Sequence, residues 1–175
     1  MKKQTKFYNV IFPIWFLIFL PPVWLIVIPA NFLIDTIVLL ISLIFVCRDT
    51  RGVKEFYKRS IIKVCIIGFL CDAVGAGLLA LSQFVFADFL DSIVPGTSNA
   101  VAYSPFDTPL ALAIVIVSIL IAGFLIYFLN EKLSFNSTNL RLNDKKSLAI
   151  KLAIFTAPYT FLIPYSFFDR LFGIY

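Results

Sequence analysis

Two acidic residues, Asp35 and Asp72, lie inside long apolar stretches of this sequence. On membrane-insertion scales, a charged carboxylate near the centre of a bilayer costs about 2.5–3.5 kcal/mol, so an acidic residue at such a position points to a function. The chemistry available to carboxyl groups in that setting is proton transfer or cation binding. Both aspartates are therefore candidate residues of a proton or ion path.

Each aspartate has polar neighbours at helical spacing. At ~100° per residue, Asn31, Asp35 and Ser42 fall on one side of a helix. In the same way, Asp72 and Gln83 fall on one side of a second helix, which Cys65 and Gly68 share. If these polar stripes face each other, they form a ladder of polar groups from the external surface to the middle of the membrane.

The register of this ladder follows from the expected external ends of the two helices, at residues 30 and 84, and a rise of ~1.5 Å per residue. The register places Asn31 level with Gln83. It also places Ser42 level with Asp72. Asp35 then differs from Asp72 by about 10 Å in depth, which is too far for two carboxyls that share a proton.

Interhelical hydrogen bonding is an alternative role for the same polar residues. Such bonds stabilise pairs of membrane helices by about 0.6 kcal/mol on average. Asp72 lies among small residues that allow another helix to approach closely, including Gly68, Gly75 and Ala76. The sequence is compatible with a functional role for the aspartates and with this structural one.

The chain contains no histidine. This absence excludes Ser-His-Asp triads and His-ligated zinc or iron sites. The three cysteines form no C-x-x-C pair, so neither a metal site nor a cofactor is predicted. No catalytic motif is recognisable, and we do not expect an enzyme.

The composition is that of an integral membrane protein. Hydrophobic residues make up 61% of the chain and charged residues 14%, with a mean hydropathy of +0.96, far from the values of soluble domains. The basic residues flank apolar stretches, so we expect them to face an anionic lipid surface. Nucleic acid is not an expected partner.

The apolar runs predict an all-α bundle of five transmembrane helices in a single domain, residues 1–175. A tight turn at residues 29–31 is expected to join the first two helices as a hairpin, and the fourth helix, which lacks any charge, is expected to lie at the periphery of the bundle, facing lipid. The predicted spans are residues 10–29, 30–47, 62–84, 109–129 and 148–168.

The distribution of charge predicts the orientation. Apart from Arg170, all Lys and Arg residues fall in stretches 2–6, 48–63 and 132–151, whereas stretch 87–108 carries aspartates and neither Lys nor Arg. Cytoplasmic loops are enriched in Lys and Arg. Five spans with the N-terminus inside and the C-terminus outside satisfy all three basic stretches, whereas four spans would place residues 2–6 outside.

The densest basic segment predicts a patch at the membrane surface. It would anchor the chain to anionic lipid headgroups or dock a partner. Its basic residues are Arg48, Arg51, Lys54, Lys58 and Arg59.

Two functional classes follow from these patterns. One is an ion- or proton-coupled transporter or channel component that works through the intramembrane carboxylates. The other is a non-catalytic scaffold or accessory subunit of a larger membrane complex. Since 175 residues are few for a self-contained carrier, we expect a homo-oligomer or a membrane-protein partner. The abundance of Phe, Ile and Lys hints at a low-GC bacterial genome, and hence at the bacterial cytoplasmic membrane.

Overall fold

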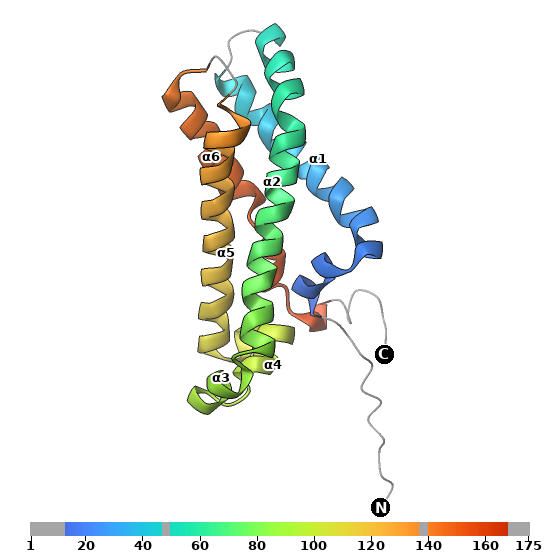
Figure 1. Cartoon of the computed structure of the whole chain (residues 1–175), viewed down its shortest axis with the longest axis vertical. Helices are drawn as coiled ribbons and strands as arrows, with labels where there is room; N and C mark the ends of the chain where they lie inside the picture. The colour runs from blue at the N-terminus through green and yellow to red at the C-terminus, as the bar shows by residue number, and fades with distance from the viewer. Residues whose placement is uncertain (1–12, 47–49, 137–139, 168–175) are drawn as a thin grey trace, which may run out of the picture.

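The structure, a computed structural model, describes residues 13–46, 50–136 and 140–167. All regular elements within these ranges are helical (Figure 1), so the all-α prediction is confirmed for the described chain. In order, the elements are η1 (Ile14–Phe19), α1 (Pro21–Val46), α2 (Thr50–Phe84), α3 (Ala87–Ile93), α4 (Thr97–Tyr103), η2 (Pro105–Asp107), α5 (Pro109–Leu129), the π-helical turn η3 (Asn130–Ser134), α6 (Leu142–Thr156) and η4 (Tyr159–Leu162).

Three segments among the described residues are helical, long and apolar enough to cross a membrane. They are Pro21–Val46, Gly52–Phe84 and Pro109–Ser134. Together with α6 they form a four-membered bundle, in which α1 and α5 each pack against both α2 and α6. Large apolar side chains cover the outside, as with Leu25 at 82% exposure and Leu120 at 65%. An apolar surface of this kind is compatible with a membrane protein, whose outer side chains face lipid.

The two ends of the bundle (Figure 1) differ in the charge of their residues. The basic end contains the start of α2, η3 and the start of α6, and most of the described Lys and Arg residues lie in or next to these segments. The acidic end contains α3, α4 and η2, with Asp88, Asp91 and Asp107. Asp91 accepts hydrogen bonds from the Ser98 backbone N–H (2.8 Å) and hydroxyl (2.6 Å). These bonds hold the pKa of Asp91 below its usual range and tie α3 to α4.

Helix α1 is continuous, so the hairpin turn predicted at residues 29–31 is wrong. Pro29 lies inside this helix. A proline removes one backbone donor and bends a helix, but membrane helices tolerate it because neighbouring groups compensate. The boundary predicted between spans 10–29 and 30–47 is therefore absent, and the described part of the first span forms η1 and the first turns of α1.

The segment before α1 folds back onto the acidic end of the bundle. Trp15 is 2% exposed, and its indole Nε1 donates a hydrogen bond of 3.1 Å to the Val101 carbonyl in α4. The Phe16 ring meets the ring of Phe84, the last residue of α2, at 6.3 Å. Element η1 therefore lies beside α4 and does not run from one end of the bundle to the other.

The span predicted at residues 148–168 is a broken helix. Helix α6 stops before Ala157, whose φ of −59° and ψ of 150° are extended. The cause is Pro158, because a proline ring clashes with a helical conformation of the preceding residue. The chain then continues through η4 to the acidic end, where the Tyr165 ring packs against Tyr103 at 6.5 Å.

Helix α5 packs against α2 and α6 along one side, so the predicted peripheral, lipid-facing position applies to its other side only. The Ser118 hydroxyl donates a hydrogen bond of 2.7 Å to the Gly75 carbonyl of α2. The opposite side of α5, with Leu120 and Phe124, is exposed, and only that side suits contact with lipid. The buried side is a stripe at helical spacing that contains Ala111, Val115, Ser118, Ala122 and Ile126.

Candidate functional site

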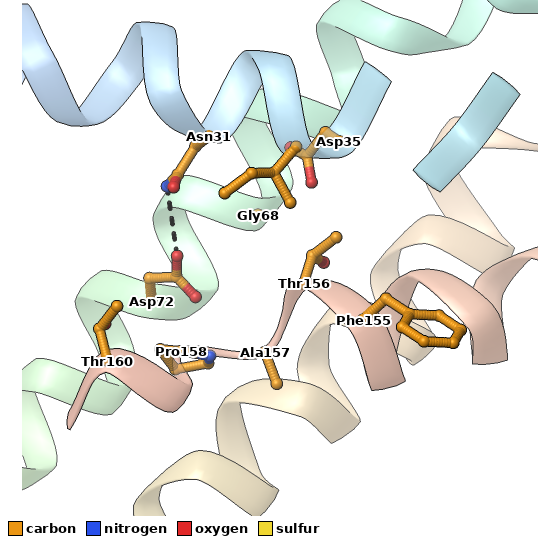
Figure 2. A pocket seen from close by; sticks show the side chains of 10 residues that line it. Asn31, Asp35, Gly68, Asp72, Phe155, Thr156, Ala157, Pro158 and Thr160 are labelled. Atoms are coloured by element: carbon orange, nitrogen blue, oxygen red, sulfur yellow. Dashed lines mark hydrogen bonds between the residues drawn. The ribbon is translucent and has the colours of Figure 1, made fainter. Parts of the chain in front are cut away.

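A cavity of about 100 Å³ lies between α1, α2 and the break after α6 (Figure 2). It is wide enough for a few water molecules. Figure 2 shows the segment from Phe155 to Thr160 opposite the two long helices. The lining residues with polar side chains are Asn31, Asp35, Asp72, Thr156 and Thr160, and Gly68 contributes backbone.

Helices α1 and α2 pair around this cavity through two facing contacts. The Asn31 side-chain amide donates a hydrogen bond of 3.4 Å to Asp72 Oδ2. One turn further along α1, Asp35 faces Gly68, where a Cβ atom would lie 3.3 Å from Asp35 Oδ2. Since the two helices are antiparallel, the two carboxyls differ by one helical turn, about 6 Å along the axis.

The register predicted for the polar ladder is therefore wrong. Asn31 reaches Asp72 instead of lying level with Gln83. The error arises because α1 begins at Pro21, whereas the sequence led us to expect a start at residue 30. The additional nine residues extend α1 further along α2 and change which residues lie opposite each other. Ser42 is buried at 3% exposure but, like Gln83, does not line the cavity. Of the predicted path residues, the structure thus brings Asn31 and the two aspartates together.

Both carboxyls are buried and incompletely hydrogen-bonded. Asp35 is 3% exposed and Asp72 9%. Asp35 Oδ2 and Asp72 Oδ1 are buried atoms without a hydrogen-bond partner. The remaining partners are the Asn31 amide for Asp72 and the Cys65 thiol for Asp35. Buried polar atoms are usually satisfied, so these two oxygens mark a site where a ligand, a proton or water is expected.

No basic side chain neutralises these carboxyls in the part of the chain that the structure describes. The cavity lining contains neither Lys nor Arg, and Arg59–Glu55, at the basic end, is the one ion pair among the described residues. The two aspartates are also close enough to interact electrostatically. Ionisation of both would therefore leave uncompensated negative charge in an apolar bundle.

The contribution of α6 was missed by the sequence analysis. Pro158 signals a break, and Thr156 and Thr160 are spaced by one helical turn. Neither signal indicates which helices this segment faces, because the pattern along one apolar segment contains no information about its neighbours.

The basic patch predicted on the loop after α1 is described in part. Arg48 lies outside the described residues, and Arg51 lies in the first turn of α2. Lys54, Lys58 and Arg59 are exposed on α2, with Arg59 paired to Glu55 at 2.6 Å. Exposed pairs of this kind contribute about 0–1 kcal/mol, so the binding of headgroups or a partner by this surface stays a prediction.

Among the described residues, no group of three or more Asp, Glu, Cys or His side chains is arranged to hold a metal ion. The sequence matches no protein-family model, no curated protein and no solved structure. The function therefore has to follow from the geometry of the cavity.

Proposed function

We propose that this chain is a small multi-pass membrane protein that moves protons or small cations, and that the cavity at Asp35 and Asp72 is its exchange site. One observation carries the proposal: both carboxyls line a polar cavity inside an otherwise apolar bundle, and each has one buried oxygen without a hydrogen-bond partner. Burying carboxyls in this setting is unfavourable, which favours a functional reason for their presence.

The same observation counts against a role as interhelical hydrogen-bond glue. A carboxyl that only joins helices is expected to use its oxygens in short bonds to other helices. The bond from Asn31 to Asp72 is long, at 3.4 Å, and the partner of Asp35 is a thiol, which is a weak donor. These bonds are too weak to offset the burial of two carboxyls.

We also propose four membrane crossings instead of five: α1, α2, α5, and α6 with the residues that follow it. The contacts of Trp15 with Val101 and of Tyr165 with Tyr103 support this count, because they bring both ends of the described chain to the acidic end. The positive-inside rule then assigns the basic end to the cytoplasm. The cytoplasmic position predicted for residues 2–6 concerns residues outside the described ranges.

This topology predicts a labelling pattern in a cysteine-free background. A membrane-impermeant maleimide added outside should label Asn99→Cys, an exposed position of α4, and should not label Gly52→Cys, an exposed position at the start of α2. Ile14→Cys distinguishes four membrane crossings from five. With four crossings Ile14 lies at the external end of the bundle, and with five it lies at the cytoplasmic end. External labelling of Gly52→Cys would contradict the orientation, and exclusively internal labelling of Ile14→Cys would contradict the count.

Proton and cation flux in proteoliposomes tests the proposed function. We expect the wild-type protein to dissipate an imposed pH or cation gradient, Asp72→Asn to lower the rate at least tenfold, and Asp35→Asn to lower it less. The amide keeps the shape of the carboxyl but cannot carry its charge or exchange its proton. Asp88→Asn makes the same chemical change at an exposed site on α3 and should leave the rate unchanged. Wild-type flux in both cavity variants, with helicity retained, would refute the proposal.

An accessory or scaffold role is the second candidate function, and it includes assembly with another copy or with a membrane-protein partner in the bilayer. The exposed Lys54, Lys58 and Arg59 at the basic end favour it, because exposed cations there suit an acidic surface. A stoichiometric complex in mild detergent that Lys54→Glu with Lys58→Glu disrupts, combined with an absence of flux, would favour this candidate over transport.

A further inference from the structure

We infer that the cavity binds a largely dehydrated monovalent alkali cation, of which sodium is the representative, between the two carboxylates and the broken end of α6. The inference rests on the proposed function and deepens it, since it names the ion that the exchange site takes. Three features of the cavity carry it: the helix end that faces it, the balance of charge around it, and the number of oxygens that remain free.

The end of α6 supplies negative partial charge to the cavity. The last carbonyls of a helix have no intrahelical N–H partner, and they form the negative end of the helix dipole. At Pro158 the following chain has no N–H to offer them. The Tyr159 hydroxyl satisfies one of these groups, the Ile154 carbonyl (2.7 Å), whereas the Thr156 hydroxyl bonds to the Leu152 carbonyl one turn earlier (2.8 Å). Broken membrane helices of this kind coordinate cations through such carbonyls.

Once a carboxyl of the pair ionises, the balance of charge requires a positive species. The titratable groups that line the cavity are the two carboxyls; behind them, the Cys65 thiol lies near Asp35 and the Cys71 thiol near Asp72. The lining residues from α6 and η4 carry no charge. The nearest cation along α6, Lys151, is directed at the Phe45 ring, with 5.7 Å between its ammonium and the ring centroid. One retained proton and one monovalent cation would make the pair of aspartates neutral.

The free oxygens favour a monovalent ion over a divalent one. Asp72 Oδ2 is already bonded to Asn31, so Asp72 offers Oδ1, and Asp35 offers Oδ2. Calcium takes 6–8 oxygens, often from bidentate carboxylates, and magnesium keeps several waters. A cavity of about 100 Å³, with one free oxygen from each carboxyl, suits an alkali ion that takes its other ligands from the Thr160 hydroxyl and the carbonyls of α6.

Radiolabelled sodium binding to the purified full-length chain in detergent tests this inference without any need for transport. We expect saturable binding at one site per chain that weakens as pH falls, because protons compete for the same carboxylates. Asp72→Asn should weaken binding at least tenfold, and Thr160→Val severalfold. The matched controls are Asp88→Asn on α3 and Thr36→Val, whose hydroxyl bonds to Tyr57 (3.1 Å) outside the cavity lining. Thermal unfolding of each variant checks the fold, and Thr160→Val keeps the test valid if Asp72→Asn does not fold.

The outcomes separate this inference from the proposed function. Sodium binding that depends on Asp72 but occurs without any flux would support the cation site and remove the transport role. Proton flux that depends on Asp72, with no sodium binding, would overturn the cation site and leave the proposed function intact. Tighter binding of calcium than of sodium, or sodium binding unchanged in both Asp72→Asn and Thr160→Val, would also overturn the inference.

Discussion

Replacing Gly75 with valine is expected to destabilise the bundle by about 1–3 kcal/mol, the usual range for overpacking a well-packed contact. A Cβ atom at this position would lie 3.1 Å from the Phe161 ring and 3.3 Å from the Ala122 Cβ. The Gly75 carbonyl also accepts the hydrogen bond from Ser118 at 2.7 Å. Gly75 lies where α2 contacts both α5 and η4. A valine side chain at this position would keep α2 from approaching α5 and would push the two helices apart.

Gly77→Val is the matched control, because a Cβ atom at Gly77 has no neighbouring atom within 4 Å. Both substitutions place the same β-branched side chain in the same helix, so their difference isolates the close packing. Unfolding of the purified variants in mixed detergent micelles measures the change. Equal stabilities of the two variants would show that the contact between α2 and α5 does not depend on a small residue at Gly75.

Replacing Gly68 with leucine is expected to lower flux at least tenfold while the helices remain folded. Gly68 lines the cavity, and its Cβ atom would lie 3.3 Å from Asp35 Oδ2. A leucine side chain would therefore displace the Asp35 carboxyl and fill most of a cavity of about 100 Å³. The effect on flux should exceed the effect on stability, because the side chain enters existing space.

Two further variants separate the effect of side-chain size at Gly68 from the effect of added bulk elsewhere on α2. Gly68→Ala adds only the Cβ atom and requires a shift of the carboxyl by a few tenths of an ångström, so its flux should fall between those of the wild type and Gly68→Leu. Gly77→Leu adds the same bulk to α2 outside the cavity lining and should conduct normally. If Gly68→Leu conducts like the wild type in proteoliposomes, the cavity does not lie on the transport path.

Much of the class of the protein could be predicted from the sequence. Long apolar runs predicted a helical membrane protein, since every backbone polar group in lipid must be satisfied within a helix. Among the described residues, the separation of Lys and Arg from Asp88, Asp91 and Asp107 along the chain became two ends of the bundle. The helical periodicity of Asp35 with Asn31 and of Asp72 with Gly68 predicted the sides of α1 and α2 that meet at the cavity.

The lengths of the helices were harder to predict, because proline has several outcomes in a membrane helix. Pro29 is accommodated inside α1, whereas Pro158 ends α6. Both prolines remove a backbone donor, and the sequence around them does not say whether neighbouring helices will compensate. The expected turn at residues 29–31 failed for this reason, and the expected register of the polar ladder failed with it.

By itself, the sequence determined the class of the protein, its helical periodicity and the position of its charges, because these properties belong to each segment alone. The tertiary structure decided which residues meet. Lipid is as apolar as the side chains of these helices, so the hydrophobic effect hardly specifies how one helix slides or rotates against another. Close contacts at small residues specify this arrangement. Gly75 contacts Ser118 between α2 and α5, and Gly68 contacts Asp35 between α2 and α1. Those contacts, together with the break at Pro158, bring two distant carboxyls and a helix end to one cavity.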